Sequence, residues 1–145
     1  MTIAQTATTS FKVELLQAVH NFNTDEFKIA LYTGAAGIDA DTATYTTTGE
    51  TSGSGYTAGG EIASVSVTPT AGNNSQGVPT AYVSFANVSW ADASFTARGA
   101  LIYNVTQGNK SVAVLDFGAD KTVAGQTFTV QFPTADANSA IVRIA

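Results

Sequence analysis

Alternation of apolar and polar residues recurs along most of the chain and predicts short β-strands. In FKIALYT, residues 27–33, large apolar side chains fall at every second position, as in a strand with one buried face. KSVAVLDFG, residues 110–118, is apolar on both faces and indicates a central strand. The same reasoning predicts further strands at 42–48, 61–68, 80–90, 94–104, 127–132 and 140–145.

Several of these strands carry more detailed expectations. Residues 42–48 alternate poorly and are nearly all Thr, Ala and Tyr, which predicts an edge strand that meets protein from elsewhere. Pro69 is expected to end the strand before it, because proline cannot donate to a sheet ladder. AGNNSQGVP, residues 71–79, predicts a loop. In the strand at 94–104, one face is expected to carry Phe95, Ala97, Leu101 and Tyr103.

One segment has the spacing of a helix. In SFKVELLQAVHNF, residues 10–22, one apolar stripe at helical spacing comprises Phe11, Leu15, Val19 and Phe22. Ser10 is a suitable N-cap for this helix. Residues 1–9 precede it and are expected to be a loose, polar lead-in.

The order of these elements predicts one all-β domain spanning residues 1–145. About seven or eight short strands separated by turn residues are typical of a β-sandwich of the jelly-roll or Greek-key type. The N-terminal α-helix is expected to pack near one end of the sandwich. The sequence contains no internal repeat and no shift of composition that would indicate a second domain.

Composition narrows the classes of function. The chain has 145 residues and no cysteine, which excludes disulfides, thiolate metal sites and cysteine nucleophiles. Its net charge of −5 and six scattered Lys and Arg residues argue against nucleic-acid or anionic-membrane binding. The first residues lack the charged and apolar regions of a secretion signal, and no apolar run is long enough to cross a bilayer. We therefore expect a soluble protein.

The segment GETSGSGYTAGG, residues 49–60, contains five glycines and invites comparison with a phosphate-binding loop. Gly53, Gly55 and Gly59 give the spacing GxGxxxG, which differs from the dinucleotide fingerprint, and no Lys-Ser/Thr pair follows. A helix should also follow a phosphate loop, whereas here a strand is predicted. We interpret the segment as a long hairpin loop or projecting flap whose glycines allow positive φ and close backbone approach.

Residues that could support catalysis or bind a metal are few. His20 is the only histidine, and near the end of the predicted helix a surface position is expected for it. Asp39 and Asp41 resemble the start of a calcium loop but lack its glycine and its final glutamate, so a turn is the better interpretation. Asp116 and Asp120 could form a carboxylate pair of the glycosidase type, although Asp and Gly also mark ordinary turns. We expect no enzymatic activity, no cofactor and no metal.

Aromatic residues leave a second alternative open. Trp90 and Tyr103 could belong to an exposed sugar-binding platform, as in a carbohydrate-binding or receptor-binding module. Burial in the core of the sandwich is the commoner role for such residues.

The chain is similar over nearly its whole length to small virion structural proteins of tailed bacteriophages. The runs that carry this resemblance are SFKVELLQAVHNF, FKIALYT, ATYTTTGETSGSGYTAGG, ARGALIYN, AVLDFGADK and FTVQFP. The resemblance implies a capsid decoration or cement protein, made in the host cytoplasm, that binds the outside of the major capsid protein shell and stabilises it. It also implies self-association as a dimer or trimer. A tail, collar or fibre-associated role is the main alternative.

Two segments are expected to make the shell or self-association contacts: residues 1–9 and the loop 41–60. Deleting the first segment, or shortening the glycine turn, should then weaken attachment and leave the fold intact. Tyr56 is a lone aromatic among glycines, so it either packs into its own core or anchors a neighbour. The candidate contact residues are Thr2, Ile3, Gln5, Thr6, Gly53, Ser54, Gly55 and Tyr56.

Overall fold

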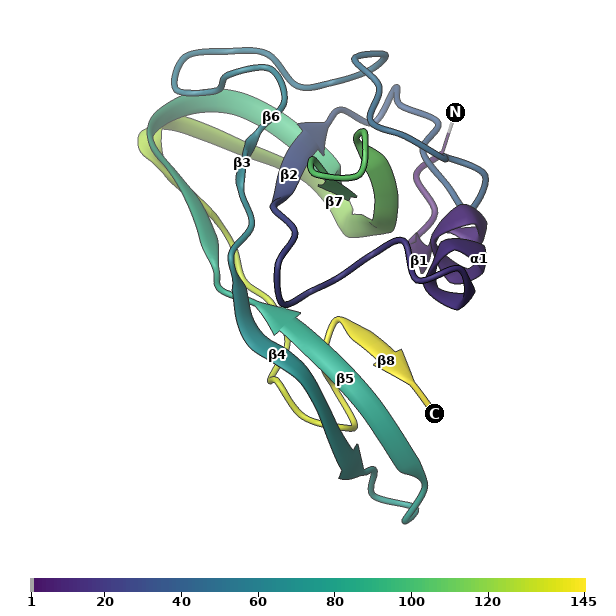
Figure 1. Ribbon diagram of the computed structural model, residues 1–145. Coiled ribbons are helices and arrows are strands. Elements are labelled where there is room, and N and C mark those ends of the chain that lie inside the picture. The colour runs from purple at the N-terminus through teal and green to yellow at the C-terminus, as the bar shows by residue number, and fades with distance from the viewer. Residues whose placement is uncertain (1) are drawn as a thin grey trace.

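The computed structural model describes residues 2–145, and Met1 lies outside them. The described chain forms one helix and two antiparallel sheets, so the predicted all-β class with an N-terminal helix is confirmed. The larger sheet has the order β1-β7-β6-β2-β3 and the smaller one β4-β5-β8 (Figure 1). The elements are β1 (Thr6–Ala7), α1 (Thr9–Leu16), β2 (Phe27–Tyr32), β3 (Glu61–Ile62), β4 (Val65–Asn73), β5 (Pro79–Phe85), β6 (Val88–Asn104), β7 (Lys110–Val130) and β8 (Val142–Ile144).

The long hairpin of β6 and β7 organises the larger sheet. Its two strands curve together from the wing up one side of the molecule and into the body, as Figure 1 shows, and β2 pairs with the second half of β6. The turn between them lies at 105–109, in the gap between the predicted strands at 94–104 and 110–118. Both strands are longer than predicted: β6 joins residues 88–90 to the predicted strand at 94–104, and β7 joins the predicted strands at 110–118 and 127–132 through residues 119–126.

The side chains of β6 change face where its register with β7 breaks. Between Ala97 and Gly99, two steps along β6 correspond to five steps along β7, from Lys121 to Asp116. Ala97 packs in the main core, whereas Leu101 and Tyr103 lie in a second cluster on the opposite face. The predicted common face for Phe95, Ala97, Leu101 and Tyr103 is therefore wrong, because the regular alternation of the strand does not continue through this break in register.

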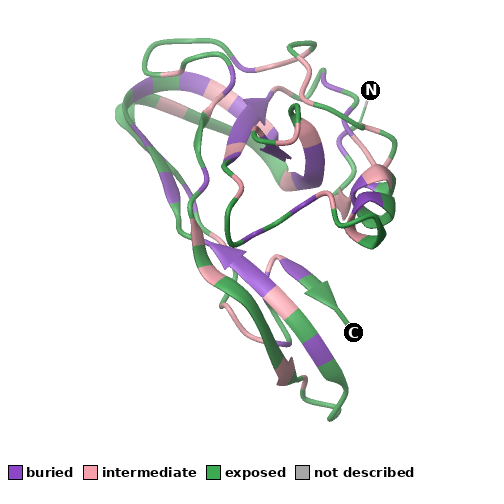
Figure 2. Ribbon diagram, viewed as in Figure 1, coloured by how far each residue is buried: buried purple, intermediate pink, exposed green. Residues whose placement is uncertain are grey.

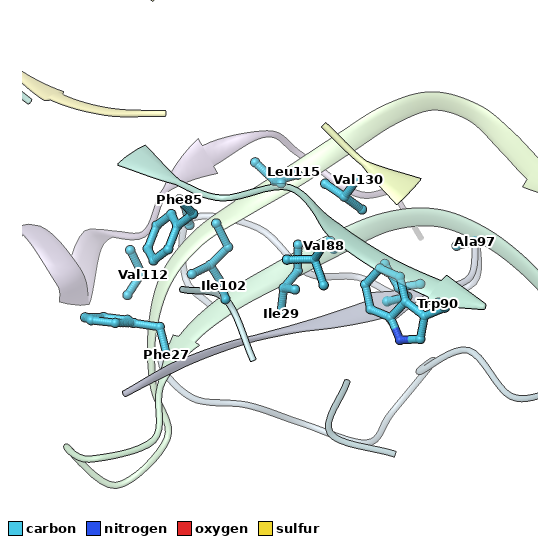
Figure 3. Packing of buried hydrophobic residues seen from close by; sticks show 14 of the residues in the cluster. Phe27, Ile29, Phe85, Val88, Trp90, Ala97, Ile102, Val112, Leu115 and Val130 are labelled. Atoms are coloured by element: carbon cyan, nitrogen blue, oxygen red, sulfur yellow. The ribbon is translucent and has the colours of Figure 1, made fainter. Parts of the chain in front are cut away.

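The main core lies between the body of the larger sheet and the start of the hairpin. Phe27 and Ile29 on β2 and Ile102 on β6 pack there with Val88 and Trp90 from the beginning of β6 (Figure 3). Each of these side chains is buried. Burial of large apolar side chains contributes roughly 1.5–3 kcal/mol per residue, so this cluster is the principal stabilising feature of the fold.

The smaller sheet extends from the body as a wing, and most of its surface is open to solvent (Figures 1 and 2). Only its inner end joins the core, through Val83, Phe85 and Val142. Pro69 was expected to end its strand, but it lies within β4, which continues to Asn73. It is tolerated there because β4 is an edge strand and its register shifts between Val67 and Thr70.

The helix is shorter than the sequence predicts. It begins at Thr9 with Thr8 as its N-cap, in place of the expected Ser10, and it ends at Leu16. Beyond it, Ala18 adopts a φ of 59°, and the Val19 N–H donates to the Glu14 carbonyl over 3.0 Å. This is a Schellman termination, in which a left-handed residue stops the helix. Phe11 and Phe22 of the predicted stripe are both buried, but Phe22 reaches the core from the following loop.

Residues 42–48 do not form the predicted edge strand. Thr44 makes a single bridge to Lys110, and the Tyr45 N–H donates to the Asn109 carbonyl over 2.9 Å. The segment therefore lies along the start of β7 of its own chain, where protein from elsewhere was expected. The predicted loop at 71–79 is shorter in the structure, because β4 runs to Asn73 and β5 begins at Pro79.

Candidate functional site

The glycine-rich segment, residues 49–60, packs against its own sheet and does not project from the molecule. Ser54 forms an isolated bridge with Ser94 of β6. A side chain at Gly53 would collide with the Ser94 carbonyl, and one at Gly60 would collide with the Ile29 carbonyl. Both glycines have positive φ, at 151° and 76°. The predicted close backbone approach is present, and the predicted projecting flap is wrong.

Glu50 holds this segment in place through both of its carboxylate oxygens. Oε1 accepts from the Tyr56 hydroxyl at 2.6 Å and from the Gly59 N–H at 2.7 Å. Oε2 accepts from the Tyr45 hydroxyl at 2.6 Å. The Tyr56 oxygen also accepts from the Leu31 N–H at 2.9 Å, which ties the segment to β2. Hydrogen bonds to an ionised carboxylate are about twice as strong as those between neutral groups. Because Glu50 accepts three of them, it is the main polar contact that holds the segment.

The ring of Tyr56 lies against its own protein. It meets Phe95 edge-on, with ring centroids 5.7 Å apart, and it lies 6.2 Å from the Trp90 ring. Of the two roles predicted for Tyr56, packing into its own core is therefore the one that the structure has. The sequence analysis did not identify Glu50, because no local motif indicates that a glutamate will accept hydrogen bonds from tyrosine hydroxyls elsewhere in the chain.

Two further tyrosines complete the Glu50 cluster, which we define as Glu50, Tyr32, Tyr45, Tyr56 and Tyr103. The Tyr103 hydroxyl donates to the Gly59 carbonyl, and the Tyr32 hydroxyl donates to the Thr46 carbonyl, both at 2.6 Å. Burial and the nearby Glu50 charge raise the pKa of Tyr103 to about 12. The other three tyrosines have their pKa values raised as well, first by burial.

These raised pKa values predict loss of stability in alkali. The native chain keeps phenolic protons that the unfolded chain releases above about pH 10, the ordinary tyrosine value. The unfolded state then binds fewer protons, so stability is complete below pH 10 and falls as pH rises through about 12. We expect the urea midpoint to be constant from about pH 8 to 9 and to fall steeply from about pH 10. The variant Tyr103→Phe should show a shallower fall, and an unchanged profile would contradict this assignment.

The N-terminal segment is docked, although a loose lead-in was expected. The Ile3 side chain is buried in the second cluster, and Thr6 and Ala7 form β1 against β7. Thr8 is fully buried, and its hydroxyl lies 2.8 Å from that of Ser111. Deleting residues 1–9 would remove an edge strand and the helix cap, so the expectation that the fold survives this deletion is not supported.

The predicted contact residues differ in what they present to a partner. Thr2, Gln5 and Ser54 are exposed, and Gln5 also accepts from the Asp116 N–H at 3.1 Å. Gly53 and Gly55 are exposed but lie against β6, while Thr6 is half-buried in β1. That the exposed residues among them contact a partner remains a prediction.

A second polar cluster lies behind the helix, where the sequence predicted only a surface histidine. His20 is buried, and its Nε2 lies 3.1 Å from Glu14 Oε1. Asn104 Nδ2 donates to Asp25 Oδ2 at 2.8 Å and lies 3.0 Å from His20 Nδ1. Because this amide nitrogen is a donor, Nδ1 accepts and Nε2 carries the proton toward Glu14. We name His20, Glu14, Asn104 and Asp25 the His20 cluster.

Charge balance in the His20 cluster favours ionised carboxylates. Lys110 Nζ lies 3.0 Å from Glu14 Oε2. Burial alone would raise the pKa of Glu14, but bonds from Lys110 and His20 outweigh it and lower that pKa. The pKa of Asp25 is lowered in the same way, chiefly by the Asn104 amide acting against burial. The cluster joins the helix to the start of the β6–β7 turn.

In front of this cluster, a groove separates the helix from the wing. It consists of two adjoining hollows of about 300 and 370 Å³, and both are lined by Leu15, Val142 and Ile144. Phe22 and Val83 line the first hollow, deep in the structure. We call this feature the α1–β8 groove. It borders β8, which lies at one edge of the smaller sheet.

The aspartates considered for catalysis are not brought together. Asp116 Oδ1 accepts from Arg98 Nε at 3.0 Å and from the Gly118 N–H at 2.9 Å. The Gly118 bond, with the Arg98 bond next, lowers the pKa of Asp116. Asp120 is exposed near Gly34. The two carboxylates therefore belong to an ion pair and a solvated strand.

The remaining candidates have structural roles. Asp39 Oδ1 accepts from the Asp41 N–H at 2.9 Å, which makes an ordinary turn of this segment. Trp90 and Tyr103 are 2% and 3% exposed, so neither can form a sugar-binding platform. Among residues 2–145, no three His, Asp or Glu side chains lie close enough together to hold a metal ion. Within the same residues, the helix falls short of the length and apolar character that a membrane span needs.

Comparison with protein-family models, with curated proteins and with solved structures gives no match to this chain.

Proposed function

We propose that the protein is a structural component of a tailed-phage virion that binds the outside of the major capsid protein shell and stabilises it. The observation that carries the proposal is the wing with the apolar α1–β8 groove beside it. The larger sheet buries the main core, whereas the wing reaches outward, and the outer edge of β8, which pairs with no other strand of the described chain, lies next to an apolar recess. Such a surface suits a protein that acts by attachment.

The resemblance of the sequence to small phage virion proteins supports the same function. The internal bonding of the glycine-rich segment also supports it, because a rigid domain loses little conformational entropy on binding. Many weak contacts repeated over a symmetric shell can add to a stable attachment.

The rival role as a carbohydrate-binding module is less well supported. It required an exposed platform containing Trp90 and Tyr103, and both side chains are in the interior. A protein of the tail, collar or fibre could use the same attachment surface, but it would be present in fewer copies per particle than a capsid decoration protein.

Copy number in purified particles tests the proposal. Quantitative mass spectrometry should find the protein at a fixed ratio to the major capsid protein, on the order of hundreds per particle. A few copies per particle would assign it to the tail instead. Absence from purified particles would contradict a virion role altogether.

A further inference from the structure

The strand β8 of the wing has three features of an edge that binds a further strand. Its outer edge has no partner strand in the described chain, an apolar groove adjoins it, and basic residues lie beside it. β8 ends the order β4-β5-β8, so its outer edge pairs with no other strand of the described chain. It pairs with β5 through Val142, Arg143 and Ile144. Val142, Arg143 and Ile144 of β8 line the second hollow of the α1–β8 groove. In Figure 1, β8 lies on the side of the wing nearer to α1. An extended peptide can add to such an edge by main-chain hydrogen bonds, with alternate side chains entering pockets.

Apolar side chains line the groove and are only partly covered. Leu15 contributes to both hollows from the helix, and Ile144 contributes to both from β8 while remaining 57% exposed. Leu16, the next residue along the helix, is 92% exposed but lines neither hollow. A bound segment with apolar residues at alternate positions would bury this surface.

The charge around the groove is positive, in contrast to the protein as a whole. Lys12 and Arg143 both line the second hollow, and both are exposed. Among the described residues that line the two hollows, no Asp or Glu occurs. Two of the six basic residues therefore line the same hollow in a chain of net charge −5. Carboxylates on the bound segment would complement this charge and set its register.

We infer that the α1–β8 groove binds an extended segment of the shell protein, whose apolar side chains enter the hollows and whose carboxylates lie beside Lys12 and Arg143. The inference rests on the proposed function for the identity of the partner. A second copy of this chain fits less well, because strands paired about Arg143 would place two arginines together.

A peptide titration followed by NMR tests the inference. The full chain, labelled with ¹⁵N, is titrated with a short blocked peptide in which valine alternates with glutamate, and with a matched valine–lysine peptide. The glutamate peptide should give saturable amide shifts at 142–144 and at Leu15. Arg143→Glu should weaken its binding about tenfold, as should Lys12→Glu. The control Lys121→Glu, at an exposed position on β7, should leave it unchanged.

Three outcomes would overturn the inference. They are equal binding of the two peptides, no saturable shift at β8, and shifts at β8 that depend on protein concentration without peptide, which would assign the edge to self-association. A comparison of how much Arg143→Glu and wild-type protein remains on purified heads distinguishes failure of this inference from failure of the proposed function. Loss of the variant from heads that retain the wild type supports the groove. Equal retention means that attachment uses another surface.

Discussion

Replacing Glu50 by alanine is expected to lower the free energy of unfolding by about 3 kcal/mol. The substitution leaves the hydroxyls of Tyr45 and Tyr56 and the Gly59 N–H without their common acceptor. A polar group that loses its partner away from water costs about 1–3 kcal/mol, and three groups are affected here. Urea denaturation monitored by circular dichroism measures the change.

Two further variants identify the cause of this loss. Glu50→Gln keeps one carbonyl acceptor of the same shape, so it should retain more than half of the stability that alanine removes. Glu61→Ala, at an exposed position on β3, should change the free energy of unfolding by less than about 0.5 kcal/mol. If alanine at position 50 were as mild as alanine at position 61, the role assigned to Glu50 would be wrong.

Gly60→Ala is expected to destabilise the protein by about 4 kcal/mol. The φ of 76° is strained for alanine, and the new Cβ would also lie 2.6 Å from the Ile29 carbonyl carbon of β2. The glycine-rich segment would have to leave the sheet to relieve this overlap. The measurement is again the free energy of unfolding.

Gly77→Ala is the matched control for Gly60→Ala. Its φ is 75°, nearly the same, yet nothing lies within 4 Å of the added Cβ. Only the backbone strain of about 1 kcal/mol is then expected. Equal losses in the two variants would mean that the glycine-rich segment does not pack tightly against β2, and the close approach described for Gly60 would be wrong.

The fold class could be predicted because alternation is a local signal. Each strand needs only its own sequence to show a buried face, so most strands and the 105–109 turn were found. The end of the helix could not be predicted, because its left-handed residue is Ala18, where glycine or asparagine would have been the signal. The change of face along β6 near Gly99 could not be predicted from the local sequence either, because it depends on the register with β7.

The candidate site was predictable only in part. Five glycines predicted positive φ and close approach, but which surface they approach depends on tertiary packing. The Glu50 cluster draws tyrosines from four separate stretches of the sequence, so no spacing shows it. His20 was expected at the surface because its partners Glu14 and Asn104 meet it only in the folded chain. The α1–β8 groove likewise joins a helix and a strand from opposite ends of the chain.

Rebinding of the purified protein to isolated shells tests the central claim most directly. Shells from a phage lacking this protein are mixed with increasing amounts of the full chain and sedimented. The proposal predicts that the bound amount saturates at a fixed ratio to the major capsid protein, and that loaded shells resist heat better than bare ones. No cosedimentation with intact shells, together with recovery of the protein in tail fractions, would contradict it.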